Sequence, residues 1–210
     1  MTVTADERAA LANLFDDLGP DQPTLCGDWT TRDLVAHLLV RERRFDAAGG
    51  ILVPALAKRT EKVQAHVAAR PYVELVDEFR EGPPFWSPLG WPVVGDHANM
   101  FEFYVHHEDV RRAQPDWQPR PDDATRDDAL WKPLKLAAKM LFRHSPVGVV
   151  LRSAGRADIV ARKGDRSVTL VGLPGEIVLI GFGRSPDVAR VVIEGAPDDV
   201  AAFIASKRGL

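Results

Sequence analysis

The sequence predicts an α+β protein, with a helical domain over residues 1–145 followed by a small α/β domain over residues 146–210. Apolar residues recur at helical spacing through most of the first 144 residues. Short runs typical of β-strands follow Pro146. A last segment, from Pro197 to Lys207, begins with the proline that often occupies the first turn of a helix.

Two capping boxes are expected to start the first two helices. Thr4 to Glu7 fits one of them, and the helix that follows is expected to end at Gly19-Pro20. Thr30 to Asp33 fits the second, before a helix that carries His37 and ends near Gly49-Gly50. In each box a threonine and an acidic residue satisfy backbone N–H groups that have no partner within the helix.

Three further helical segments complete the first domain. Residues 53–81 follow a helical pattern that Pro71 should interrupt, because a proline ring clashes with the preceding turn. Residues 82–95 contain four prolines and three glycines, which predicts a long loop rich in tryptophan and phenylalanine. Helices are then expected over 97–113 and 125–144, on either side of a linker that contains prolines.

The second domain is expected to contain several short strands and one terminal helix. Strand patterns cover 147–155, 157–164, 167–171 and 189–195. The apolar run at 175–183 fits a strand or a helix equally well, because a short continuous apolar run does not distinguish the two.

The composition excludes several classes of function. The formal net charge of the 210-residue chain is −3, without the basic excess of a typical nucleic-acid-binding protein. No apolar run reaches the roughly 20 residues that cross a bilayer, and the N-terminus does not resemble a secretory signal. Cys26 is the single cysteine, so we expect no internal disulfide and a reducing, cytoplasmic location. The oligomeric state stays open.

Glu102 and His106 form the pair most typical of a metal site. They are four residues apart on one expected helix, which directs both side chains to the same face. His37 is expected to face the helical interior, where packing would bring it to this pair. His97 and His107 are alternative ligands, although a spacing of five residues turns His107 away from the face of Glu102.

The same residues also fit roles without a metal. A Glu-x-x-x-His spacing arises often by chance in charged helices, and a single interior histidine is commonly a core residue. Asp109 lies three residues after His106, so it could hydrogen-bond a ligand, or it could be a solvated charge like Glu108. The basic residues near Arg41 fit a solvated helix face.

Two motifs resemble those of a known family. The stretch TLCGDWTTRDLVAHLLVRE (24–42) resembles the first motif of mycothiol-dependent maleylpyruvate isomerase-like proteins, in the DinB-like metalloprotein superfamily. The stretch EFYVHHEDVRRA (102–113) is similar to the Glu-x-x-x-His helix of that family, and the run that follows looks like an actinobacterial branch. The resemblance implies that His37, Glu102 and His106 bind one divalent metal. Zinc is expected, and nickel, iron or manganese suit the same ligands.

The resemblance also implies a fold and an activity. The first domain is expected to be a DinB-like four-helix bundle, and residues 147–210 resemble the α/β domain often appended to it. Such proteins use mycothiol as a cosubstrate for isomerisation of a small electrophile, or for transfer of the thiol to it. The resemblance makes Arg184, in the GFGR segment 181–184, the candidate for the arginine that binds an acidic substrate, and a surface arginine is the alternative.

Other functions stay open at this stage. The metal could serve a non-catalytic or regulatory module, or a hydrolase with Glu108 or Asp109 as its base. The aromatic loop, with Phe85, Trp86 and Trp91, could line a pocket or close the end of the bundle. Cys26 is interpreted as a structural residue, because no adjacent base is evident from its spacing.

Overall fold

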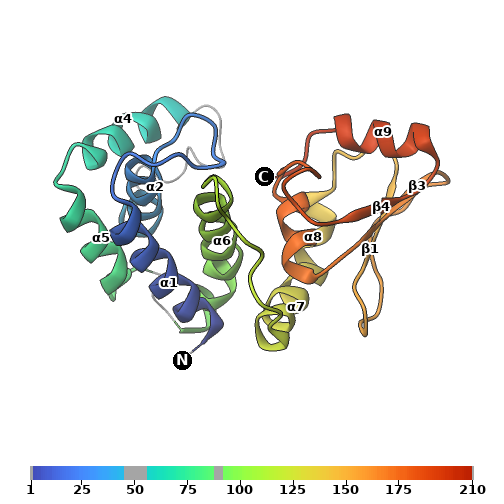
Figure 1. The fold of residues 1–210 in the computed structure, drawn as a ribbon, viewed down its shortest axis with the longest axis horizontal. Coiled ribbons are helices and arrows are strands. Elements are labelled where there is room, and N and C mark those ends of the chain that lie inside the picture. Colours follow the sequence, from blue (N-terminus) through green and yellow to red (C-terminus); the bar gives the residue numbers. More distant parts are fainter. Residues whose placement is uncertain (1, 45–55, 88–91, 210) are drawn as a thin grey trace. The chain divides into compact units, whose positions relative to one another are not determined.

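The computed structural model describes residues 2–44, 56–87 and 92–209, with only the backbone described for 92–98. The chain divides into two compact units, Met1–Arg120 and Pro121–Leu210. Helices make up the first unit, and the second combines helices with a four-stranded sheet (Figure 1). This arrangement confirms the predicted α+β class.

The described part of the first unit contains five helices around an apolar core: α1 (Val3–Leu18), α2 (Thr31–Arg43), α4 (Ala57–Ala68), α5 (Tyr72–Glu81) and α6 (Pro92–Arg112). Helix α1 packs against α5 and α6, and α2 packs against α4 and α5. In the core, the Phe79 ring meets Phe15 and Phe103 edge to face, with centroid distances of 6.0 and 5.6 Å. Such aromatic pairs add to the free energy gained from burial, so they join α1, α5 and α6 firmly.

Pro71 interrupts the third helical segment as predicted. Helix α4 ends at Ala68, and Pro71 is the N-cap of α5. A proline is compatible with a helix start because the first N–H groups of a helix have no partner within it. Helix α2 ends at Arg43, with Arg44 as its C-cap, so the expected end near Gly49-Gly50 is wrong. The two glycines themselves lie outside the described residues.

The two expected capping boxes have different outcomes. Thr30 and Asp33 form the box at the start of α2, where each side chain accepts a hydrogen bond from the backbone N–H of the other. The box at Thr4–Glu7 is wrong, because α1 begins before it. The cap of α1 is Thr2, whose hydroxyl accepts a hydrogen bond from the N–H of Ala5 at 3.3 Å.

Replacing Thr30 by alanine is expected to lower the free energy of unfolding by about 1 kcal/mol, because the start of α2 loses a side-chain acceptor. Urea denaturation at equilibrium measures this change. Thr125→Ala is the matched control, because Thr125 is an exposed residue in the first turn of another helix and is not its cap. Equal losses in the two variants would contradict the prediction.

Helix α6 begins earlier than the sequence predicted. It starts at Pro92, within the expected loop 82–95, so the expected start at residue 97 is wrong. The reason is that a proline with no N–H to donate fits a first helical turn as well as a loop. The end of the helix at Arg112 agrees with the prediction.

The second unit packs three helices with a mixed sheet. Its elements are α7 (Ala124–Leu141), β1 (Gly148–Arg152), β2 (Ile159–Arg162), β3 (Ser167–Val171), α8 (Pro174–Gly181), β4 (Val192–Glu194) and α9 (Pro197–Ala205). The strand order is β2-β1-β3-β4, with β1 and β3 parallel and both outer pairs antiparallel. Alternate residues of the two central strands are buried, as expected for strands with one face on the core: Val149, Leu151, Val168 and Leu170.

The ambiguous apolar run at 175–183 forms most of helix α8. Every residue of α8 is buried, which explains why its sequence is apolar on all sides and shows no helical periodicity. Helix α7 packs against α8 and β2, so it belongs to the second compact unit. The domain boundary near residue 145 stays a prediction. Among the described residues, no helix is both long and apolar enough to cross a membrane.

Candidate metal centre

His37, Glu102 and His106 come together from two helices of the first unit. His37 lies on α2, and the other two lie one turn apart on α6. The Nε2 atoms of His37 and His106 lie 3.2 and 3.3 Å from the same oxygen, Oε1 of Glu102. The three side chains are only 10%, 18% and 13% exposed in chain order, so the cluster is largely shielded from water.

The local sequence explains how these side chains are positioned. The capping box at Thr30 fixes the start of α2 and therefore the face on which His37 lies. The Trp29 ring packs on the His37 ring at a centroid distance of 5.0 Å, which restricts its rotation. On α6, a four-residue spacing stacks Glu102 and His106 on one face. The rings of His37 and His106 then meet edge to face at 5.5 Å.

The distances between these atoms fit one tetrahedral cation. Zinc–nitrogen and zinc–oxygen bonds at tetrahedral angles place neighbouring ligand atoms about 3.3 Å apart. The two Nε2 atoms lie 3.2 and 3.3 Å from Glu102 Oε1, which matches this spacing. Three such donors also leave one position of a tetrahedral ion for a further ligand.

Asp109 contacts His106, and Arg41 contacts Glu102, each at an atom that does not take part in the His37–Glu102–His106 contacts. Asp109 Oδ2 lies 3.0 Å from His106 Nδ1, which favours a proton on Nδ1 and directs Nε2 toward the cluster. Arg41 Nε lies 3.4 Å from Glu102 Oε2, the carboxylate oxygen that the histidines do not contact. The Arg41 side chain is 16% exposed, so the interpretation of this residue as part of a solvated face is wrong.

The charges around the cluster shift two pKa values. Burial alone would raise the pKa of Glu102, but Arg41, His106 and His37 hold it well below its usual value. Burial alone would lower the pKa of His106, but hydrogen bonds with Asp109, Cys26 and Glu102 raise it well above its usual value. Without a cation, the pair is therefore a carboxylate and an imidazolium. A divalent cation bound between them would displace a proton from His106, and the Glu102 carboxylate would neutralise part of its charge.

A family model, described as the mycothiol maleylpyruvate isomerase N-terminal domain, matches residues 3–128. The chain belongs to this family. The matched residues run from α1 into the start of α7 and include the whole cluster with Asp109. The resemblance of the two motifs is thereby confirmed. No curated protein and no solved structure matches the chain.

In this member of the mycothiol maleylpyruvate isomerase family, His107 and Glu108 face away from the cluster. His107 Nδ1 lies 2.8 Å from the Glu7 carboxylate on α1, as its spacing from Glu102 suggested. Glu108 is 1% exposed and is bound by Arg111 and Arg112, so it is not the solvated charge that we considered. The other alternative ligand, His97, has a side chain outside the described part of the structure.

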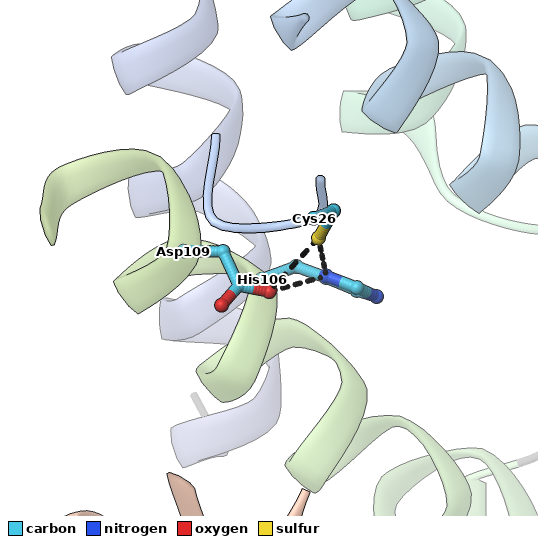
Figure 2. Close-up of side chains that lie close together, drawn as sticks. All are labelled: Cys26, His106 and Asp109. Carbon is cyan, nitrogen blue, oxygen red and sulfur yellow. Dashed lines mark hydrogen bonds and ion pairs between the residues drawn. The ribbon is translucent and has the colours of Figure 1, made fainter. Parts of the chain in front are cut away.

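Cys26 was interpreted as structural because its spacing showed no adjacent base, but the structure places its Sγ beside His106 and Asp109. Its Sγ lies 3.2 Å from Asp109 Oδ2 and 3.6 Å from His106 Nδ1 (Figure 2). The backbone N–H of Leu25 donates to the backbone carbonyl of Asp109 at 3.1 Å, which holds this loop against α6. The available signal was the place of Cys26 inside the first family motif, 24–42.

Arg184 lies in the second unit, beyond the residues that the family model matches. Its guanidinium donates a hydrogen bond to the carbonyl of Phe182 at 2.6 Å, which fixes the side chain near its own turn. The role of Arg184 toward an acidic substrate stays a prediction.

The aromatic loop does not form a packed plug in the described residues. Phe85 and Trp86 are 90% and 51% exposed. Trp91, the third aromatic residue of that loop in our prediction, lies outside the described residues.

Proposed function

We propose that the chain binds one divalent cation, zinc, through His37, Glu102 and His106, and uses mycothiol as a cosubstrate. One observation carries the proposal: two imidazole nitrogens converge on one carboxylate oxygen at the spacing of tetrahedral zinc ligands. The chain belongs to a family named for a mycothiol maleylpyruvate isomerase, which is why we propose mycothiol as the thiol. The set of three donors leaves room for that thiol.

A zinc ion at this position would supply the positive charge that favours the thiolate form of a bound thiol. The side chains around the site hold the three ligands in the orientation that this role requires. Asp109 holds the Nδ1 proton of His106 so that Nε2 faces the cation. Arg41 binds one oxygen of Glu102 and leaves the other to act as a ligand. Trp29 holds the ring of His37 in place.

The reaction that we propose is the addition of the thiolate to an electrophilic small molecule. In an isomerisation, the thiolate adds to one carbon of a cis double bond conjugated to a carbonyl group, the π electron pair moves onto that carbonyl, and the resulting single bond rotates. Departure of the thiolate then restores the double bond in the trans form. In a transfer, the new S–C bond persists, and the adduct is released after it takes up a proton. Arg184 is proposed to bind an acidic group of the substrate through its planar guanidinium.

Cobalt substitution tests the use of a thiol. Cys26→Ser protein loaded with Co²⁺ has no thiol of its own, so any sulfur signal must come from an added compound. Addition of mycothiol is expected to change the visible spectrum of the bound cobalt and to create a thiolate-to-cobalt absorption band. A spectrum that stays unchanged at saturating mycothiol would overturn the proposal. The disulfide of mycothiol, which lacks the thiol, is the control addition and should have no effect.

A further inference from the structure

Cys26, His106 and Asp109 form a second group of ligand atoms (Figure 2), which shares His106 with the first group. We propose that this group is a second metal site, which binds a thiophilic divalent cation such as zinc or cadmium. The ligand atoms are Cys26 Sγ, His106 Nδ1 and Asp109 Oδ2, which lie within 4.8 Å of one another. The site goes beyond the proposed function, because it uses neither His37 nor Glu102.

The distances among the three atoms match the edges of a tetrahedral site. Sγ lies 3.6 Å from His106 Nδ1 and 3.2 Å from Asp109 Oδ2, and Nδ1 lies 3.0 Å from Oδ2. Zinc–sulfur bonds of about 2.3 Å place sulfur about 3.5 Å from a nitrogen or oxygen ligand, and the N–O edge is about 3.3 Å. Each observed distance agrees within a few tenths of an ångström.

The backbone around Cys26 holds the sulfur at this position. The Thr24 hydroxyl accepts from the Cys26 N–H at 3.1 Å and donates to the carbonyl of Trp29 at 2.8 Å. Leu25 binds the backbone of Asp109, the residue that supplies the oxygen ligand. The loop is therefore tied to α6 at the site itself, so a cation would meet ligands that are already in place.

The surroundings favour a positive charge at this position. The Asp109 side chain is fully buried, and a carboxylate removed from water is stabilised by a cation beside it. A thiolate with an imidazole selects zinc-like cations over magnesium or calcium, which prefer oxygen ligands. Binding would release the thiol proton and the Nδ1 proton to water.

His106 belongs to both groups, through different ring nitrogens. Its Nε2 lies 3.3 Å from Glu102, and its Nδ1 lies 3.0 Å from Asp109. The two nitrogens of one imidazole can each bind a cation when neither carries a proton, so a cation at the second site would take the place of the Nδ1 proton that Asp109 holds when only the first site is filled.

A cobalt titration without added thiol tests the proposal. A thiolate-to-cobalt band in the near ultraviolet can arise only from Cys26, because the chain has one cysteine. The band is expected in the unchanged chain and in His37→Asn, and it should vanish in Cys26→Ser. Asp109→Asn is expected to weaken the cobalt affinity reported by the band at least tenfold. Absence of the band from both the unchanged chain and His37→Asn at saturating cobalt would overturn the proposal.

Alkylation of Cys26 by iodoacetamide gives a second measurement, which does not depend on a variant of the site. Zinc is expected to slow the alkylation of the unchanged chain at least tenfold, whereas magnesium should not. The same protection is expected in His37→Asn, where the first cluster lacks a ligand. An alkylation rate that zinc leaves unchanged would contradict the second site. This result is independent of the mycothiol experiment, which uses Cys26→Ser, so either proposal can fail while the other stands.

Discussion

Replacing His37 by asparagine is expected to weaken zinc binding at the His37–Glu102–His106 cluster by more than about 100-fold. Loss of a residue that merely supports a metal ligand costs about 10- to 100-fold in affinity, and loss of a ligand should cost more. The His37 ring supplies one of the two nitrogens that converge on Glu102. Its removal leaves two donors, which is too few for a tight site.

Competition with a chromophoric chelator measures this affinity. A Cys26→Ser background confines the measurement to the cluster, because it removes the sulfur ligand of the second proposed site. His66→Asn is the matched control, since His66 is an exposed histidine near the end of α4. The control should bind zinc as tightly as its parent. An affinity that His37→Asn also leaves unchanged would show that His37 is not a ligand.

Zinc should also raise the melting temperature of the Cys26→Ser parent, because a ligand that binds only the folded state stabilises it. The rise is expected to disappear in His37→Asn and to persist in His66→Asn. Differential scanning calorimetry with and without zinc separates this loss of binding from a loss of folding.

Local patterns in the sequence predicted the features that depend on neighbouring residues. The one-turn spacing of Glu102 and His106 placed them on one face, and Pro71 marked the break between two helices. The capping box at Thr30 was confirmed because both of its partners lie within four residues. The α+β class followed from the change of pattern after Pro146. Each of these depends on spacing along one segment.

Features that depend on distant segments could not be predicted in the same way. Cys26 meets Asp109 across 83 residues, and no pattern within the Cys26 loop shows that contact. The failed box at Thr4 has the same origin. Its acidic member, Glu7, is drawn into contacts with His107 and Arg120, which are 100 and 113 residues away. Spacing along the sequence therefore predicted part of the His37–Glu102–His106 cluster, and it predicted nothing of the group that contains Cys26.

These contacts of Glu7 lead to the second large effect that we expect. The Glu7 carboxylate is 2% exposed, with Oε2 at 2.8 Å from His107 Nδ1 and Oε1 at 2.6 Å from Arg120 Nη2. Burial alone would raise its pKa, but the hydrogen bonds and charges of His107 and Arg120 lower it from 4.5 to about 2. The ion pair thus links α1 to α6 and to the segment that follows α6.

The lowered pKa gives the stability of the fold a defined pH dependence. Because the pKa is lower in the folded chain, the folded state binds fewer protons than the unfolded state as the pH falls below 4.5. The contribution of Glu7 is therefore complete above about pH 4.5 and is lost as the pH falls toward 2. A shift from 4.5 to about 2 corresponds to about 3 kcal/mol.

Glu7→Gln is expected to lower the free energy of unfolding by about 3 kcal/mol at pH 7, because Arg120 loses its nearer buried counter-charge and keeps only Glu108, at 3.5 Å. Urea denaturation at a series of pH values from 7 to 2.5 measures the difference in free energy of unfolding between this variant and the unchanged chain. This gap should narrow below pH 4.5. Glu61→Gln, at an exposed position on α4, should show no such gap at any pH. A gap for Glu7→Gln that stays constant through the acid range would mean that the stabilisation comes from packing and not from the charge of the carboxylate.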